Sequence, residues 1–497
     1  MSNLYAHIEQ TALRDPAREL LITDQGERFT WGDLHSQSAR YANALARTGV
    51  RIGDRVAVQV DKSVQSLFVY LACLRAGFVY LPLNTAYQRS ELSYFIGDAK
   101  PRAIVCRPQS RGEVEAMAAG ATVHTMGEDG TGSLYQAAAQ CAPVHAIAQV
   151  DEGALAAIIY TSGTTGRSKG AMITHRNLVS NARVLVEYWG FTGKDVLLHA
   201  LPMFHVHGLF VASHCALLSG ARMIWHRRFE PALVLRDLPK ASVLMGVPTF
   251  YTRLLSEAGF DRTSCAGVRL FVSGSAPLLM ETFSAFEQRI GQRILERYGM
   301  SEAGMITSNP LHGERKGGTV GRPLPGNEVR VADDRDAALR AGQIGAIQIR
   351  GENVFTGYWN MPEKTREEFT VDGWFRTGDV GVFDAQGYLS IVGRAKDLII
   401  TGGYNVYPKE IELVLDSLHG VAESAVFGVP HADFGEAVTV AVVPREGATL
   451  SEPDIISALR RELANYKVPK RVIIIDDLPR NAMGKVQKNV LRERHAD

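Results

Sequence analysis

Residues Ile158–Gly170 read IIYTSGTTGRSKG and form the most informative segment of the chain. The apolar residues 156–159 predict a buried β-strand, which leads into a loop of glycine and hydroxyl residues. The loop holds three glycines, five serine or threonine residues and one lysine, Lys169. Glycines let backbone N–H groups turn towards one point, and the hydroxyls and the cation add donors that suit a polyphosphate. The segment therefore predicts a phosphate-binding loop that follows a buried strand.

Two other interpretations of this loop have to be weighed. The Walker A pattern needs Gly-Lys-Ser/Thr, whereas Lys169 follows Ser168 and precedes Gly170, so the P-loop NTPase interpretation fails. Three glycines among serines and threonines would by themselves favour a flexible surface loop. The full string YTSGTTGRSKGAMITH over 160–175 is far more specific than that composition.

Length and composition fit an ordinary globular enzyme with two or more domains. The chain has 497 residues, 46% hydrophobic and 22% charged, with a formal net charge of +1. There is no basic excess that would indicate nucleic acid, no apolar run that would span a bilayer, and no secretory signal pattern. The five cysteines are scattered and lack CxxC spacing. We therefore expect a cytoplasmic protein with reduced thiols and without nucleic-acid or membrane partners.

Helix and strand patterns alternate through residues 1–107 and again after the phosphate loop, which predicts a mostly parallel sheet covered by helices. Residues 108–152 are less periodic, and we expect surface helix and connector there. From about Gly318, short alternating runs broken by glycine and proline predict a β-rich subdomain. A boundary at 393–396 precedes a compact α+β unit. The expected helices are 30–49, 64–75, 90–98, 248–255, 279–290, 409–418 and 452–464; the expected strands include 55–60, 77–83, 103–106, 196–201, 222–225, 242–245, 269–273, 328–331, 346–350, 388–392, 398–400, 422–429, 437–443 and 471–475.

Further motifs follow the phosphate loop in a fixed order: SGSAPL (273–278), ERYGMSE (296–302), WFRTGD (374–379), GRAKDLIITGGYNVYPKEIE (393–412) and NAMGK (481–485). Together they resemble the acyl-adenylate-forming superfamily of acyl-CoA synthetases, adenylation domains and firefly-type luciferases. The resemblance implies an α/β fold with a large N-terminal AMP-binding domain of parallel and mixed sheets plus a β-rich subdomain (1–393), a hinge (394–396) and a small mobile C-terminal α+β domain (397–497).

The resemblance also implies a two-step reaction. A carboxylate attacks the α-phosphate of MgATP to give an acyl-adenylate and pyrophosphate, and the thiol of coenzyme A then displaces AMP. No protein nucleophile is needed, in agreement with the absence of a Ser/His/Asp or Cys/His motif. Segments such as LPLNTAY, HALPMFHVHGLFVAS and GVPHADFGEAV are most similar to those of malonyl-CoA synthetases. We therefore expect malonate, ATP and coenzyme A as substrates, with Mg²⁺ as cofactor and methylmalonate as a further acid.

The resemblance implies roles for individual residues in these motifs. Glu302 is the expected Mg²⁺ ligand, and Ser301, where the family usually has threonine, offers a hydroxyl to the α-phosphate. Lys485 is the mobile cation between the carboxylate and the α-phosphate, Lys396 is the hinge, and Gly402 and Gly403 line the coenzyme A path. The residues expected to bind ATP or AMP are Thr161, Ser162, Gly163, Thr164, Thr165, Gly166, Lys169, Gly274, Ser275, Ala276, Tyr298, Gly299, Met300, Asp379 and Arg394. Without their motifs, Tyr298 would be read as core packing, Asp379 as a turn residue and Lys485 as a solvated tail charge.

The second carboxylate of malonate needs a fixed cation or several donors when it is buried. Arg297 lies next to Tyr298, and a guanidinium suits a carboxylate in bidentate fashion; an ion pair with Glu296 is the alternative. His207 in FHVHG is a candidate donor, with a packed neutral core histidine as the alternative, and Arg315 is a weaker candidate without an assigned place.

Three rival functions stay open at this point. Another short-chain or aryl acyl-CoA synthetase would need an apolar acid pocket, against which Arg297 argues. A carrier-loading module would act on a protein-bound pantetheine, and a non-catalytic nucleotide-binding relative would not need both Glu302 and Lys485. A protein lysine acetyltransferase acting on Lys485 is a further expected partner, because acetylation removes the charge.

Overall fold

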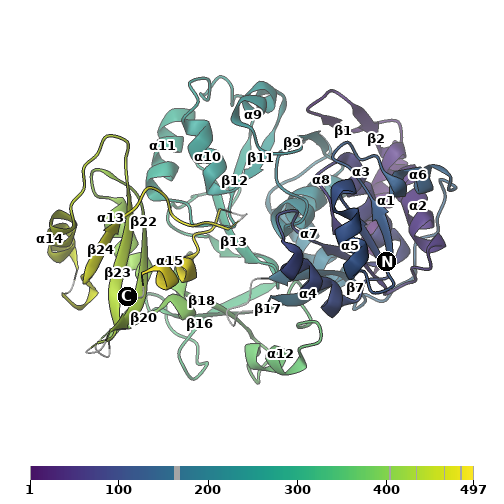
Figure 1. Ribbon diagram of the computed structural model, residues 1–497. Coiled ribbons are helices and arrows are strands. Elements are labelled where there is room, and N and C mark those ends of the chain that lie inside the picture. The colour runs from purple at the N-terminus through teal and green to yellow at the C-terminus, as the bar shows by residue number, and fades with distance from the viewer. Residues whose placement is uncertain are drawn as a thin grey trace.

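The computed structural model describes residues 2–161, 168–401, 404–431, 434–463, 465–481 and 484–495. In this part of the chain the strands form four sheets, of six, nine, four and five strands. Figure 1 shows the six-stranded sheet near the N-terminus, the nine-stranded sheet extending from there to the middle of the molecule, and the five-stranded sheet, with α13 and α14, at the opposite end. The architecture is the predicted α/β class with a large N-terminal part and a small C-terminal α+β unit.

The six-stranded sheet carries the phosphate-loop strand. Its order is β6 (Thr122–Thr125), β5 (Ala103–Cys106), β3 (Arg55–Gln59), β4 (Val79–Pro82), β7 (Leu155–Thr161) and β8 (Lys169–Thr174). The first five strands run parallel, whereas β7 and β8 form an antiparallel hairpin in which Thr161 pairs with Lys169. The phosphate loop is therefore the connection of this hairpin. The helices of this region are α2 (Trp31–Arg47), α3 (Val64–Ala76), α4 (Arg89–Ala99), α5 (Arg111–Met117) and α6 (Ser133–Ala139).

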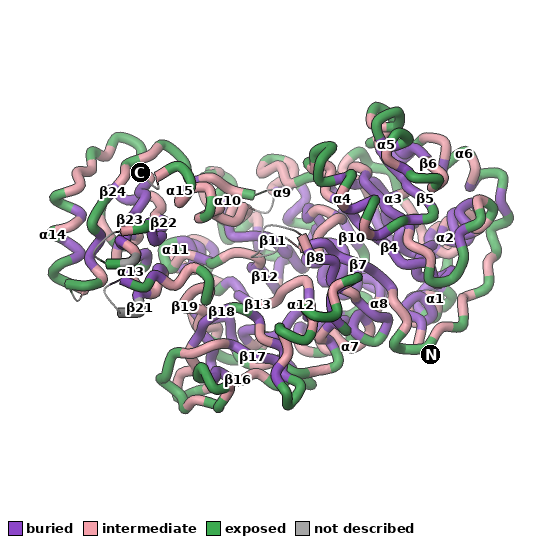
Figure 2. The backbone as a smooth tube through the Cα atoms, turned by 60° about the horizontal axis from the view of Figure 1, so that its bottom comes forward, coloured by how far each residue is buried: buried purple, intermediate pink, exposed green. Residues whose placement is uncertain are grey.

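Local sequence explains where these helices begin and end. Thr30 and Asp33 form the capping box of α2, and Ser63 and Ser66 form the capping box that starts α3. Nearly every side chain of α3 is buried, because the helix lies between other helices and the sheet and ends at Gly77 in a left-handed conformation. Figure 2 shows that buried residues follow the strands of the large sheets, which form the core.

The nine-stranded sheet joins distant parts of the chain. Its order is β15 (Arg322–Pro323), β14 (Gly304–Ser308), β13 (Leu295–Met300), β12 (Leu270–Ser273), β11 (Val243–Gly246), β9 (Val196–His199), β10 (Arg222–Trp225), β1 (Glu19–Thr23) and β2 (Arg28–Thr30). The strands from β1 to β13 are parallel neighbours, and β14 pairs antiparallel with β13. The associated helices are α1 (Leu4–Arg14), α7 (His175–Tyr188), a π-helix (His207–Ala212), α8 (Ser213–Ser219), α9 (Pro231–Asp237), α10 (Pro248–Leu255) and α11 (Met280–Ile290).

The two remaining sheets are smaller. The antiparallel sheet β16 (Asn327–Ala332), β17 (Gly345–Gly351), β18 (Phe375–Phe383) and β19 (Leu389–Arg394) is the predicted β-rich subdomain, with α12 (Pro362–Glu368) beside it. A 3₁₀ turn, Ala395–Asp397, then leads into the C-terminal unit. That unit contains β20 (Ile399–Thr401), β21 (Tyr404–Val406), α13 (Pro408–Asp416), β22 (Val421–His431), β23 (Gly435–Pro444), α14 (Glu452–Glu462), β24 (Arg471–Ile474) and α15 (Lys488–Arg494).

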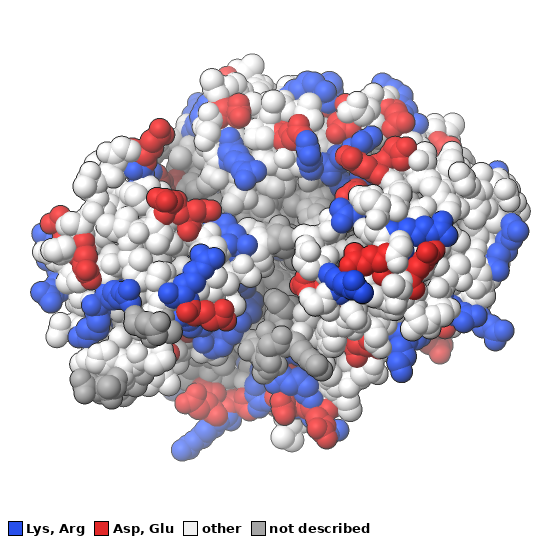
Figure 3. Space-filling model, viewed as in Figure 1, with Lys and Arg blue, Asp and Glu red and all other residues white. Residues whose placement is uncertain are grey.

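The structure corrects the expectation for residues 108–152. Thr122–Thr125 is not a connector but the edge strand β6, which pairs in parallel with β5. Its four residues are too short for a periodic signal, and two of them, His124 and Thr125, are polar yet buried. In the described part of the chain, no helix has both the length and the apolar character needed to cross a bilayer. Acidic and basic side chains are interspersed over the face shown in Figure 3, as the balanced composition predicts.

Candidate functional site

Strand β13 carries the residues around which the site is built. Successive side chains of a strand point to opposite faces, so Arg297 and Tyr298 face different surroundings. Arg297 faces α10 and the start of the π-helix, as shown by the effect of its positive charge on the pKa values of Tyr251, His205 and His207. Tyr298 faces the four-stranded sheet, where it contacts Asp379 of β18.

The Arg297 guanidinium is buried without a complete set of partners. The residue is 3% exposed, and its Nε and Nη2 atoms have no hydrogen-bond partner. Burial lowers the pKa of Arg297 to about 9. Gly274 makes room for the side chain: a Cβ atom added there would lie 2.6 Å from the guanidinium carbon. A buried cation with unused donors is costly unless an acceptor reaches it, so the position suits an anionic ligand.

Beside Arg297 lies a neutral histidine. The His207 ring is buried, and its Nδ1 lies 3.3 Å from the Ser275 hydroxyl, while its Nε2 has no partner. Burial, and next the nearby positive charge of Arg297, hold the pKa of His207 well below its ordinary value. Ser275 has a φ of +72°, a left-handed conformation that side chains rarely adopt and that is often found at functional sites. Arg297, His207 and the Gly274–Ser275 turn therefore lie next to one another, and the assignment of Arg297 and His207 to the acid stays a prediction.

The other face of β13 holds a closed polar network. The Tyr298 hydroxyl donates to Asp379 Oδ2 at 2.6 Å, and Arg394 Nε lies 3.1 Å from Asp379 Oδ1. The Asp379 backbone N–H donates to the Thr377 hydroxyl at 3.1 Å, which fixes the carboxylate at the middle of β18. Burial, followed by the charge of Asp379, holds the pKa of Tyr298 well above its ordinary value, so the phenol is neutral. Three residues that are predicted to bind the nucleotide are therefore connected directly by a hydrogen bond and an ion pair.

Lys485 approaches this network from the C-terminal unit. Burial, and next the positive charge of Arg394, lower the pKa of Lys485 to about 8, while Asp379 opposes the shift. Its backbone N–H donates to Asn481 Oδ1 at 3.0 Å, which holds the turn in shape. A Cβ atom added at Gly484 would lie 3.8 Å from the Thr249 side chain on α10, so the last loop lies against the N-terminal part.

Glu302 lies where the turn after β13 meets the phosphate-loop hairpin. Its side chain is 6% exposed, and its Oε1 accepts from Thr161 Oγ1 at 3.3 Å and from the Tyr358 hydroxyl at 3.2 Å. Burial raises the pKa of Glu302 above its ordinary value. Lys169 Nζ lies 4.2 Å above the Tyr358 ring and pairs with Glu368 at 3.2 Å. The two ends of the predicted phosphate loop, Thr161 and Lys169, are thus next to the predicted metal ligand.

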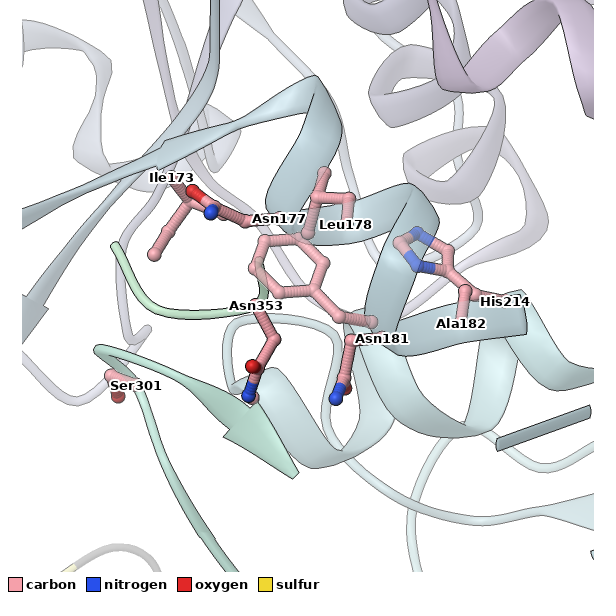
Figure 4. A pocket seen from close by; sticks show the side chains of 10 residues that line it. Ile173, Asn177, Leu178, Asn181, Ala182, His214, Ser301 and Asn353 are labelled. Atoms are coloured by element: carbon pink, nitrogen blue, oxygen red, sulfur yellow. The ribbon is translucent and has the colours of Figure 1, made fainter. Parts of the chain in front are cut away.

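The remaining residues predicted for the site are distributed around it or lie away from it. Ser301 lines a cavity of about 20 Å³ together with polar residues of α7 and Asn353, shown in Figure 4, which is room for roughly one water molecule. Arg315 donates to the carbonyl groups of Pro310, Leu311 and Arg293 and does not join the site. Lys396 lies in the 3₁₀ turn before β20, Gly299 and Met300 end β13, and Ala276 follows β12. Ser162, Gly163, Thr164, Thr165, Gly166, Gly402 and Gly403 lie outside the described residues.

Sequence reasoning missed two residues of the site. Tyr358 connects Glu302 to Lys169, and it follows a glycine in a segment that has no other polar signature. His205 is beside Arg297, and burial together with that charge lowers the pKa of His205 to about 4. The FHVHG segment contains both His205 and His207, but the sequence prediction includes only His207.

Comparisons with known proteins agree with this geometry. The model of the AMP-binding enzyme family matches residues 8–359, and that of the AMP-binding enzyme C-terminal domain matches residues 410–485. The mitochondrial malonate–CoA ligase of Mus musculus is 35% identical over 95% of this chain and 88% of its own length. A feruloyl-CoA synthase of Amycolatopsis is 36% identical over 94% of each chain.

A solved structure of ATP-bound MatB from Rhodopseudomonas palustris is 53% identical and covers 100% of this chain and 99% of its own, with a TM-score of 0.98. The structure of the same protein in its apo form has the same coverage and a TM-score of 0.85. The present structure is thus more similar in overall arrangement to the ATP-bound form.

Proposed function

We propose that this chain, which belongs to the AMP-binding enzyme family, is an ATP-dependent malonate–CoA ligase that acts through a malonyl-adenylate. The products are malonyl-CoA, AMP and pyrophosphate. The observation that carries the choice of malonate is the buried Arg297 guanidinium, whose Nε and Nη2 donors are unused. The relatives named as malonate–CoA ligases support the same acid.

The geometry explains why the acid should be a dicarboxylate. One carboxylate of malonate reacts, and the other stays charged and must be buried. Arg297 offers two unused N–H groups to this second carboxylate, and His207 Nε2 is a further polar atom without a partner. A feruloyl or other aryl acid would instead place apolar atoms against these donors and leave them unsatisfied. Methylmalonate keeps both carboxylates, so we infer that it is a weaker second substrate.

Adenylation depends on positioning and charge. The attacking carboxylate oxygen forms a bond to the α-phosphorus as pyrophosphate leaves, and negative charge gathers at that centre. Lys485 supplies the nearby positive charge; its position beside Asp379 and Arg394 supports this role. Tyr298 and the 274–276 turn flank the base, and Asp379 with Arg394 takes the ribose hydroxyls. Thr161 and Lys169, at the two ends of the hairpin loop, are positioned for the phosphates.

Mg²⁺ fits the donor set at Glu302. Magnesium is commonly held by one or two carboxylates together with substrate phosphates and water, so a single buried carboxylate beside the phosphate loop is sufficient. The described residues contain no cluster of three or more potential ligands that would form a protein-only site. Glu302 and the phosphates would hold the ion, which when bound neutralises phosphate charge.

Thioester formation requires a second arrangement of the C-terminal unit. We infer a boundary at residue 393, a hinge at 394–396 that includes Lys396, and rotation of residues 397–497 so that Gly402 and Gly403 line the path of coenzyme A. The difference between the two forms of MatB in their similarity to this structure supports such a movement. Acetylation of Lys485 by a lysine acetyltransferase would block the first step and stays a prediction, as does a cytoplasmic location.

A panel of acids tests the proposal. Purified enzyme, ATP and Mg²⁺ are combined with malonate, methylmalonate, propionate, benzoate or ferulate, and pyrophosphate release is measured with and without coenzyme A. We expect malonate to have the highest kcat/KM, with sustained turnover only when coenzyme A is present. Preference for a monocarboxylic acid would contradict the substrate, and turnover that needs a pantetheine-bearing protein in place of coenzyme A would identify a carrier-loading enzyme.

A further inference from the structure

A lysine outside the site just described is buried between the two large sheets. Lys62 follows β3 and precedes the N-cap residue of α3. Its Nζ donates to His199 Nδ1 at 2.8 Å and to the His199 carbonyl at 2.7 Å, and lies 4.2 Å above the Trp225 ring. His199 and Trp225 are paired in register at the ends of β9 and β10. Lys62 thus connects the six-stranded sheet to the carboxyl ends of two strands of the other.

The contacts of the His199 ring fix its tautomer. Its Nε2 lies 3.0 Å from the Gly208 carbonyl oxygen, which only accepts, so Nε2 carries the hydrogen. Nδ1 is then the acceptor for Lys62. The ring is therefore hydrogen-bonded to the lysine on one side and to Gly208 on the other, so that a shift of the lysine would change the contact with Gly208. The Ser213 hydroxyl also donates to the Gly208 carbonyl, at 2.8 Å. Two side-chain donors therefore converge on one backbone oxygen.

Gly208 is the second residue of the π-helix, and His207 is the first. π-Helical turns are uncommon and often occur at functional sites. The backbone here is tightly confined, because a Cβ atom at Gly208 would lie 2.2 Å from the Pro202 carbonyl oxygen. A shift of the Gly208 carbonyl would accordingly move His207, whose ring lies near the Arg297 charge.

We propose that Lys62 is a specificity-determining positioning residue, which acts through His199 and the Gly208 carbonyl to hold His207 in the acid pocket. The inference rests on the proposed function, since it assumes that the pocket receives the second carboxylate. Lys62 does not touch the substrate; it sets the geometry of a residue that does.

Burial without a carboxylate partner supports this assignment over a role in packing. Within the described residues, no carboxylate is in ion-pair contact with Lys62; burial holds its pKa well below the ordinary value, and the more distant charge of Asp24 opposes that shift. An apolar side chain would fill the same space at lower cost, because desolvating an amine is unfavourable. The three contacts of Nζ, two with His199 and one with Trp225, offset that cost only in this geometry.

Lys62→Met tests the inference, since methionine retains the unbranched stem and removes the donors. We expect the KM for malonate to rise about tenfold while the KM for ATP changes less than about twofold. The ratio of kcat/KM for malonate to that for propionate should fall by a similar factor. Tyr70→Phe is the matched control: it removes a buried hydrogen bond to His214, one residue beyond Ser213, and should leave the ratio unchanged.

Thermal unfolding of each variant separates positioning from folding. If Lys62→Met fails to fold, Ser213→Ala decides the question, because it removes the other donor to the Gly208 carbonyl and should lower the same ratio by about threefold. Equal losses with malonate and propionate, or an unchanged ratio in a folded variant, would overturn the inference. A wild-type enzyme that prefers a monocarboxylic acid would overturn the proposed function itself, and this result is visible before any variant is made.

Discussion

Arg297 and Tyr298 are neighbours on β13, yet the two faces of the strand differ in whether their buried polar groups already have partners. On the Tyr298 face, the phenol, Asp379 and Arg394 satisfy one another without a ligand. On the Arg297 face, Nε and Nη2 of a nearly inaccessible guanidinium have no acceptor. A ligand that binds the first face has to exchange one set of polar contacts for another.

The difference indicates which face sets affinity and which sets selectivity. Replacing existing hydrogen bonds by equivalent ones yields little net free energy, as in folding itself. An unpaired buried charge gains much more from an acceptor of the right shape, and it rejects a ligand that lacks one. We therefore expect the Tyr298 face to bind any adenylate and the Arg297 face to select the acid.

Removal of Lys485 has the largest expected effect and tests whether the Tyr298 face, which Lys485 approaches, takes part in catalysis. Lys485→Ala should lower malonyl-adenylate formation by about 10³-fold or more, because no other positive charge would replace it at the α-phosphate. Thioester formation from preformed malonyl-adenylate and coenzyme A should stay near normal. Single-turnover assays of each half-reaction measure the two effects, and equal loss of both would make Lys485 a structural residue.

Glu302→Gln tests the turn after β13, which faces the phosphate-loop hairpin and handles phosphate charge. The substitution nearly preserves shape and removes one formal charge, so adenylation should fall by about 10²-fold. Raising the Mg²⁺ concentration should restore part of the rate. A magnesium titration of pyrophosphate release provides the measurement, and an unchanged magnesium dependence would remove Glu302 from the metal site.

Arg297→Ala tests whether the Arg297 face selects the acid. Loss of the pair with the distal carboxylate should cost about 3 kcal/mol, or roughly 150-fold in kcat/KM for malonate. Propionate and butyrate lack that charge and should be affected far less. The KM for ATP serves as the internal control. Similar losses for all three acids would show that the two faces are not independent.

The pH profile tests the charge of Lys485 without a substitution. Since the pKa of Lys485 is lowered to about 8, the protonated fraction falls as the pH rises through that value. Adenylation should therefore decrease by about tenfold between pH 7 and pH 9, at constant Mg²⁺. The ratio of malonate to propionate activity should not change between pH 7 and pH 8, where Arg297 with its pKa lowered to about 9 is mostly protonated, and it should begin to fall as the pH approaches 9. A ratio that already changes between pH 7 and pH 8 would contradict this separation.

Tyr298→Phe should have the smallest effect. It removes one hydrogen bond from a network whose other members remain, so the KM for ATP should rise about threefold. The Asp379 carboxylate would still face Arg394. The selectivity among acids should be that of the wild type, and initial-rate kinetics with both substrates varied would check both statements. A change in acid preference would mean that the strand transmits changes between its faces.

Much of this arrangement was predictable because it is local in sequence. The boundaries of α2 and α3 follow from Thr30 and Ser63. The ERYGM motif also predicts that Arg297 and Tyr298 serve the acid and the nucleotide, and those two roles stay predictions. Contacts between distant segments were not predictable: Tyr358 meets Glu302 across 56 positions, and Lys62 meets His199 across 137. Lys169 was expected to face phosphate, and in the structure it is paired with Glu368, a partner 199 positions away. Local patterns specify elements, whereas such pairings depend on how the sheets are placed.

The missing side chain at Gly274 has a consequence for redesign of the enzyme. Because a Cβ atom there would overlap the Arg297 guanidinium, the two positions cannot be varied independently. Replacing Arg297 by a shorter side chain, in order to admit bulkier acids, leaves a void beside Gly274. Replacing Gly274 by a larger residue while Arg297 is retained displaces the arginine. Their effects on substrate range should be strongly non-additive, as is usual for side chains in contact. A search for new acid substrates would therefore have to sample both positions together, in pairs.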